Sequence, residues 1–253
     1  MLTAPIVPTA VAPGVMRLGT RLLNWYVIEE DGRLTVVDAG LPCYRPQLTR
    51  ALATLGRSLA DIEAVILTHA HADHVGLAER LRREAGARVY VHEGDARLAG
   101  SLSPFGPSER TILPYLRHPR APLRLLGHIA ACGGLRPRPI ERFRTFTDGE
   151  VLEVPGRPRA IATPGHTAGH TAFHFERHDV LLAGDAICTL NPLTGTPGPQ
   201  VLPAAFSVST AEELASVGRL EESGAAVLLP GHGEPWTDGV AAAVHRARMV
   251  GPT

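Results

Sequence analysis

The chain has 253 residues, is 44% hydrophobic and carries 25 basic and 25 acidic residues, so its formal net charge is zero. This length suits one sizeable domain, and the balanced charge gives no general indication of a nucleic-acid partner. Cys43, Cys132 and Cys188 are odd in number and far apart, so we do not expect a disulfide framework. Because residues 1–15 lack an export-signal pattern and no apolar run reaches ~18 residues, we expect a cytoplasmic protein without membrane contact.

The chain begins with two expected strands, residues 22–30 and 34–37, joined by a tight hairpin turn at Asp31-Gly32. Residues 46–55 have the pattern of a helix that ends at Gly56. Further strands are expected at residues 64–67, 88–92, 150–154, 159–162, 172–175, 180–183 and 225–229, and helices at 77–82, 94–99 and 211–222. This mixture of strands and helices predicts an α/β or α+β fold.

A basic, proline-rich insertion interrupts this pattern at about residues 101–147. It has eight arginines against two glutamates, a net charge of +6, and includes a helical stretch at 123–131. One interpretation is a lid over the active site that selects an anionic or acyl-bearing substrate. Its apolar inner face would be Leu113, Leu116, Leu123, Leu125, Leu126 and Ile129, and its basic rim Arg117, Arg120 and Arg124. The alternative is a solvated insertion whose arginines pair with acids elsewhere.

Four side chains that can bind a metal lie within six residues: His69, His71, Asp73 and His74. Alternate residues of an extended segment point the same way, so His69 and His71 can hold one ion together. Asp73 and His74, at the turn into a helix, are displaced from that pair and can serve a second ion. Imidazole with carboxylate suits zinc, or iron or manganese, better than calcium.

Four more polar side chains follow apolar runs that read as strands: Asp38, His166, Asp185 and His232. Glycine lies next to three of them, in Gly165-His166, Gly184-Asp185 and Gly231-His232, and permits a close backbone approach. Because functional sites in sheet proteins gather beyond strand ends, we expect these residues to meet the first group at one edge.

With its H-x-H-x-D-H string at residues 69–74 and these later residues, the chain resembles the metallo-β-lactamase-fold superfamily over roughly residues 15–240. The resemblance implies one domain over 1–253, folded as a four-layer αβ/βα sandwich. It implies that His69, His71 and His166 hold a first metal, that Asp73, His74 and His232 hold a second, and that Asp185 bridges both. Asp38 would orient a ligating histidine. His170 is a further candidate for such a role, with core packing or a surface position as the alternative.

The resemblance implies a metal-dependent hydrolase with two divalent ions, zinc being expected. A hydroxide between the ions would attack an ester, thioester or lactone-type small molecule, with Asp73 and Asp185 as the catalytic carboxylates. Only 21 residues follow His232, too few for the C-terminal helical region of glyoxalase II enzymes. Alternatives within the fold are a persulfide dioxygenase with one iron and a phosphodiester or nucleic-acid hydrolase. Oligomeric state is not indicated.

Overall fold

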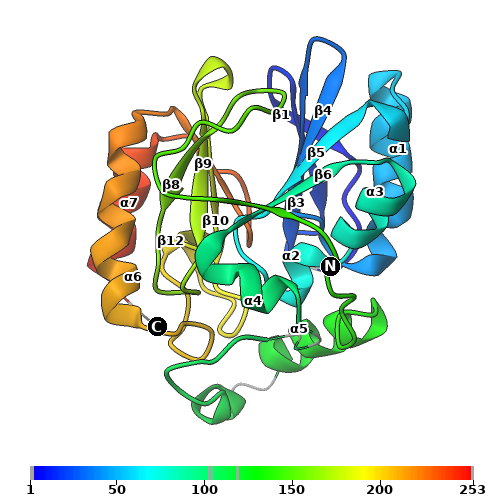
Figure 1. Ribbon diagram of the computed structural model, residues 1–253. Helices are drawn as coiled ribbons and strands as arrows, with labels where there is room; N and C mark the ends of the chain where they lie inside the picture. Colours follow the sequence, from blue (N-terminus) through cyan, green and yellow to red (C-terminus); the bar gives the residue numbers. More distant parts are fainter. Residues whose placement is uncertain (1–2, 102, 104, 118–119, 252–253) are drawn as a thin grey trace.

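The computed structural model describes residues 3–101, 103, 105–117 and 120–251. Two β-sheets lie face to face, and helices cover the outer face of each (Figure 1). The layers therefore run helix, sheet, sheet, helix, which is the mixed α/β sandwich predicted from the sequence. Within the described residues, no helix is long and apolar enough to cross a membrane.

The larger sheet has seven strands that follow the order of the chain. They are β1 (Thr9–Ala12), β2 (Val15–Gly19), β3 (Asn24–Glu30), β4 (Arg33–Val37), β5 (Ile62–Ile66), β6 (Arg88–His92) and β7 (Arg144–Phe146). The first four strands pair antiparallel, and β4 to β7 pair parallel. Asp31 and Gly32, with φ of 51° and 78°, form the predicted two-residue turn between β3 and β4.

The smaller sheet has the strand order β13-β10-β9-β8, and β11 with β12 forms a separate hairpin. These strands are β8 (Arg159–Ala162), β9 (Thr171–Phe175), β10 (Val180–Gly184), β11 (Cys188–Leu190), β12 (Pro197–Gln200) and β13 (Val227–Pro230). Strand β9 is antiparallel to both neighbours and β13 is parallel to β10. Strands β8, β10 and β13 therefore end at the same edge of the sheet.

Helices α1 and α3 cover the larger sheet, and α6 and α7 cover the smaller one (Figure 1). The helices are α1 (Arg45–Leu55), α2 (Ala72–Val75), α3 (Ala78–Glu84), α4 (Ala96–Ala99), α5 (Arg120–Ala131), α6 (Thr210–Ser216) and α7 (Val240–Val250). Short 3₁₀ turns are η1 (Pro42–Tyr44), η2 (Leu59–Asp61), η3 (Glu93–Asp95), η4 (Leu113–Arg117), η5 (Glu176–His178) and η6 (Val217–Ser223). Helix α1 ends as predicted at Gly56, whose φ of 65° is left-handed.

The core between the sheets follows from the alternation of side chains along each strand. In β3, Trp25 and Val27 pack toward the helices, whereas Tyr26 and Ile28 point to the second sheet, where they meet side chains such as Phe173. Each of these side chains is buried. Full burial of an apolar side chain of this size contributes ~1.5–3 kcal/mol to folding, so the two sheets are held together mainly by this layer.

Some expected boundaries differ from the structure. Residues 150–154 were expected as a strand but form a loop with a single bridge, Val151 to Arg159. Leu152 and Val154 are buried, so the alternating pattern is real, but the chain turns at once because the amide of Val154 donates to the carbonyl of Leu152. The last residues of the insertion, Arg144–Phe146, pair with β6 as strand β7. Strands β1, β2, β11 and β12 and helix α7 were not predicted.

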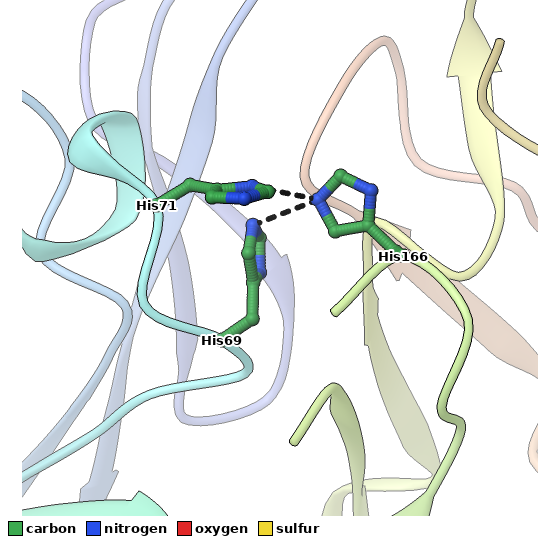
Figure 2. A group of neighbouring side chains, drawn as sticks. All are labelled: His69, His71 and His166. Carbon is green, nitrogen blue, oxygen red and sulfur yellow. Dashed lines mark hydrogen bonds between the residues drawn. The ribbon is translucent and has the colours of Figure 1, made fainter. Parts of the chain in front are cut away.

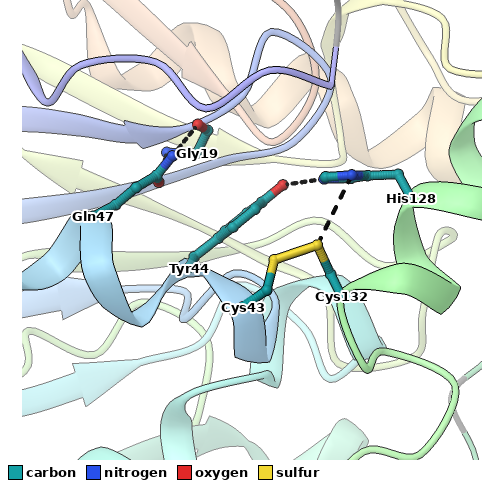
Figure 3. Close-up of a disulfide and its surroundings, with 6 residues drawn as sticks. All are labelled: Gly19, Cys43, Tyr44, Gln47, His128 and Cys132. Atoms are coloured by element: carbon teal, nitrogen blue, oxygen red, sulfur yellow. Dashed lines mark hydrogen bonds between the residues drawn. A yellow bond between two sulfur atoms is a disulfide. The ribbon is translucent and has the colours of Figure 1, made fainter.

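The sequence predicts no disulfide framework, but the structure has one disulfide. Cys43 in η1 and Cys132 after α5 form a disulfide with their Cα atoms 4.9 Å apart (Figure 3). Beside it, the Tyr44 hydroxyl lies 2.7 Å from Nε2 of His128. The two cysteines are 89 residues apart, so only the fold brings them together. Cys188 is free and buried.

Removal of this disulfide should lower stability without unfolding the chain, because the crosslink restricts the unfolded state. The double variant Cys43→Ser/Cys132→Ser should lose about 2–4 kcal/mol of unfolding free energy in urea denaturation. Reductant should destabilise the wild type but leave the double variant unchanged. Unreduced, denatured wild type should show one reactive thiol, and three thiols would contradict the pairing.

Candidate metal centre

The seven predicted ligands meet at one edge of the two sheets, beyond the ends of β5, β8, β10 and β13. They are His69, His71, Asp73, His74, His166, Asp185 and His232, and they form overlapping groups of three whose ligand atoms lie within 4.8 Å of one another. Parallel strand ends explain the meeting, since each loop leaves its sheet at the same edge. All seven side chains lie in this cluster, and their roles as ligands remain predictions.

The first group contains three histidines whose ring nitrogens point to one another (Figure 2). Nε2 of His166 lies 2.9 Å from Nδ1 of His71 and 3.1 Å from Nε2 of His69. Nitrogen ligands at ~2.0–2.1 Å around a tetrahedral zinc ion would be about 3.3 Å apart, which is close to this spacing. His69 and His71 come from the loop after β5, and His166 from the loop after β8.

Asp185 connects the first group to the second. Its Oδ2 lies 3.5 Å from Nε2 of His166 and 3.1 Å from Nε2 of His232. Its Oδ1 lies 3.5 Å from Nε2 of His74. Asp73 completes the second group, with Oδ2 3.9 Å from the Nε2 atoms of both His74 and His232. The Asp185 carboxylate therefore reaches the imidazoles of both groups.

Asp38, at the end of β4, holds two parts of the motif in place. Its carboxylate accepts hydrogen bonds from the backbone amide and the hydroxyl of Thr68, at 2.8 and 2.9 Å, and lies 2.8 Å from Nδ1 of His74. An acceptor on Nδ1 places the proton there and leaves Nε2 free to bind a metal. Asp38 has φ of 59°, a left-handed conformation that is uncommon outside glycine and that collects at functional sites.

His170 and His232 are fixed in a similar way through hydrogen bonds to the backbone. Nε2 of His170 accepts the amide of Asp185 at 3.0 Å, and its Nδ1 lies 2.7 Å from the hydroxyl of Thr163. His170 is fully buried, which excludes a surface position, and its role in orienting Asp185 remains a prediction. Nδ1 of His232 donates to the carbonyl of Leu22 at 2.6 Å, which leaves its Nε2 facing the site.

The electrostatics of the cluster suit a cation. Burial and the neighbouring histidines hold the pKa of His69 well below its usual value, so this imidazole is neutral, the form that binds a metal. Burial alone would also lower the pKa of His74, but Asp185 and two further carboxylates raise it to about 10. Buried Nε2 of His74 and buried Oδ1 of Asp185 have no hydrogen-bond partner in the described part of the chain. A metal ion would satisfy both atoms, so the donor set fits the implied ions.

Sequence reasoning missed the residues that support the loop of His232. Asn24 donates through Nδ2 to the carbonyls of Pro230 and Gly233 at 3.0 and 2.6 Å, and Tyr26 donates to Pro230 at 2.7 Å. Buried Arg17 donates to Gly233 at 3.0 Å. These side chains belong to β2 and β3, more than 200 residues earlier in the chain, and no local pattern marks them.

The two-sheet αβ/βα sandwich, with a cluster of histidine and aspartate side chains at the sheet edge, is the arrangement expected of a metal-binding fold. A family model described as the metallo-beta-lactamase superfamily matches residues 18–232, and the chain belongs to this superfamily. That match confirms the resemblance and the fold predicted from the sequence.

Similar proteins span much of the chain. Probable metallo-hydrolase YflN of Bacillus subtilis is 27% identical over 89% of this chain and 86% of its own length. A hydroxyacylglutathione hydrolase of Serratia proteamaculans is 29% identical over 64% of this chain, which spans 46% of that protein. The uncharacterized protein YobT of Bacillus subtilis is 33% identical, and this chain spans 61% of it. The solved metallo-beta-lactamase family protein TTHA1429 of Thermus thermophilus superposes with a TM-score of 0.68 at 29% identity, covering 95% of this chain and 80% of that one.

Substitution of single ligands should reduce bound metal without loss of the fold, because the ligands lie in loops beyond the strands. Loss of a residue that only orients a ligand costs about 10–100-fold in metal affinity. His71→Ala and His232→Ala should each weaken metal binding by more than this. His178→Ala should bind metal like the wild type, since His178 lies in η5, where its Nδ1 is 2.8 Å from the Pro13 carbonyl. Elemental analysis after dialysis measures this, and equal loss in His178→Ala would refute the site.

Proposed function

We propose that this chain is a metal-dependent hydrolase that uses two divalent ions, zinc being expected, to cleave an ester, thioester or lactone-type small molecule. The observation that carries the proposal is the position of Asp185, whose two oxygens face both groups of imidazoles at 3.1–3.5 Å. The superfamily membership supports it, as do relatives named as a probable metallo-hydrolase and a hydroxyacylglutathione hydrolase.

The chain's own residues divide the work of the proposed reaction. His69, His71 and His166 would hold one ion, His74, His232 and Asp73 the other, and Asp185 would contact both. Two such ions, when bound, lower the pKa of a water toward neutrality and polarise a carbonyl oxygen. Asp73 is the ligand carboxylate with more exposure, 12% of its side chain against 3% for Asp185, and it lines the cavity. Its Oδ atoms are therefore placed to receive a proton and pass it to the leaving group.

A cavity of about 300 Å³ opens over the metal centre and indicates a small or medium-sized substrate. Its floor is formed by ligands, and its walls are mostly apolar: Phe105, Ile112, Leu125, Leu126, Ile129 and Phe206. Most of these come from the insertion. We call the part of it that precedes β7, residues 101–143, the cap. An apolar wall beside a carbonyl-activating centre suits an acyl-bearing substrate.

The cap differs in part from the lid expected from sequence. Leu125 and Ile129 are buried and line the cavity, but Leu113, Leu116 and Leu123 are exposed by 66%, 43% and 62%. None of Arg117, Arg120 and Arg124 lines the cavity; Arg110 does. The backbone amide of Arg110 donates a hydrogen bond to the Ala204 carbonyl at 3.3 Å. No carboxylate of the described residues lies within 4 Å of the Arg110 guanidinium. Arg110 is therefore the cation that we propose for an anionic group of the substrate.

Partners and location are proposals of the same kind: a small-molecule substrate, with no membrane and no nucleic acid, and a cytoplasmic location. The Cys43–Cys132 disulfide is an observation against that location, because such bonds persist in oxidising compartments and are rare in the cytosol.

Metal analysis combined with a substrate panel tests the proposed function. The purified wild type should hold about two zinc ions per chain and should hydrolyse at least one lactone, ester or thioester. Asp185→Asn should loosen the ions and depress the rate by at least about 100-fold, since a buried charge that faces both groups is lost. One iron per chain with oxygen consumption on a persulfide would replace the hydrolase by a dioxygenase. Turnover of phosphodiesters alone would also overturn the proposal.

Substitution of Arg110 should separate charged from neutral substrates. Arg110→Gln should raise KM several-fold for an acyl substrate with a carboxylate, weaken the salt dependence of kcat/KM, and leave a neutral ester of similar size unchanged. The matched control is Arg117→Gln, an exposed arginine whose Nε donates to Pro114 of its own turn at 3.1 Å. If both substrates lose activity equally in Arg110→Gln, the residue serves only the structure of the cap.

A further inference from the structure

Asp95 is a buried carboxylate that lies outside the ligand set. It ends η3, after strand β6, and is 2% exposed. Its Oδ2 accepts hydrogen bonds from the amide of Ala70 at 3.0 Å and the hydroxyl of Thr167 at 2.9 Å. Its Oδ1 accepts the amide of Gly169 at 2.8 Å. Hydrogen bonds to an ionised carboxylate are stronger than those between neutral groups, and a buried charge needs such partners.

All three donors belong to the loops that carry the three-histidine group. Ala70 lies between His69 and His71, and Thr167 directly follows His166. These loops leave different sheets, the first after β5 of the larger sheet and the second after β8 of the smaller one. One carboxylate therefore fixes the distance between two loops whose ring nitrogens must converge on a single ion.

The backbone at this contact is packed as closely as glycine allows. A Cβ added to Gly169 would lie 2.4 Å from the amide nitrogen of Asp95 and 2.8 Å from its Cβ. A Cβ added to Gly94 would lie 2.8 Å from the carbonyl oxygen of Ala168. Contacts this short are not available to any residue with a side chain, so the 94–95 turn touches the 168–169 turn only because both carry glycine.

The second ligand group has separate supports. His74 is held by Asp38, His232 by the carbonyl of Leu22, and the amide of Asp185 by His170. None of these contacts involves Asp95. We propose that Asp95 is a positioning residue for the His69, His71 and His166 site, and that it sets the affinity of this site for its ion while leaving the other site unaffected. This inference rests on the proposed metal centre.

Cobalt(II) titration of the metal-free protein tests the inference, because cobalt absorbance reports coordination directly. His71→Ala and His232→Ala assign the two binding steps to the first and second group. Asp95→Asn keeps the shape of the side chain but replaces one carboxylate oxygen, an acceptor, by an amide nitrogen, a donor. That nitrogen would face hydrogen-bond donors of the two loops. It should weaken the three-histidine step by about 10–100-fold and leave the other step unchanged. Gly169→Ala should act in the same direction, and Thr167→Val, which removes one of three hydrogen bonds, should have a smaller effect.

The matched control is Asp61→Asn. Asp61 also accepts one amide and one hydroxyl, both from Ser58 at 2.7 and 2.9 Å, but it caps η2 at the start of β5, the opposite end from the ligands. It should leave both cobalt steps unchanged. Asp95→Asn should recover activity when cobalt or zinc is added in excess, which a damaged fold would not.

Several results would overturn the role of Asp95. One is equal weakening of both steps, and another is a lower melting temperature of the metal-free Asp95→Asn protein with unchanged cobalt affinity. If Asp95→Asn does not fold, Thr167→Val takes its place. Unchanged cobalt affinity of the three-histidine site in folded Thr167→Val would then also overturn the role of Asp95. A wild type that binds cobalt but hydrolyses nothing overturns the proposed function and leaves this inference standing.

Discussion

The buried carboxylate of Asp185 imposes the strictest condition on this structure. It lies among four imidazoles, within 3.8 Å of Nε2 of His69 as well as the three closer ones, and it is almost fully removed from water. A buried charge is costly unless it is paired, so the loops after four strands must arrive at this point with little freedom. Glycine makes the approach possible, since a Cβ on Gly231 would lie 2.1 Å from Oδ1 of Asp185.

That condition also explains why the two sheets are joined differently at their edge than in their middle. In the middle, apolar side chains such as Ile28 and Phe173 pack face to face. At the edge, polar groups of one sheet hold the loops of the other, as when Asn24 and Tyr26 of the larger sheet bind the carbonyl of Pro230 in the smaller one. Hydrogen bonds are directional, so the edge is fixed in orientation as well as in distance. A metal site needs both.

The sequence was sufficient to select the side chains that meet at this edge, because they lie in short patterns: six residues of one string, and single residues directly after apolar runs. Their roles as ligands remain predictions. It was sufficient for strands such as β3 and β4, where hydrophobic alternation and the Asp31-Gly32 turn agree. It was insufficient wherever the cause is a distant partner. The burial of Leu152 and Val154 imitated a strand, although this segment pairs with β8 through a single bridge, Val151 to Arg159. The Cys43–Cys132 bond joins segments that are adjacent only after folding. Asn24 and Asp95 are ordinary in sequence and acquire meaning only from the carbonyls and amides that reach them.

The cap depends on a small number of fixed points rather than on a core of its own. Near its start, Glu109 accepts the amide and hydroxyl of Thr210 at 2.8 Å, and its own amide donates to Ser207. Near its end, the disulfide ties α5 to η1 (Figure 3). Between these points, a few of the side chains that the structure describes, among them Leu125 and Ile129, join the main core. Since the cavity wall is attached in this way and the predicted ligands are held by loops of the sheets, residues of the wall can change without displacing the predicted ligands. If the proposed function is correct, the cap, more than the predicted ligand set, would determine which substrate this chain accepts.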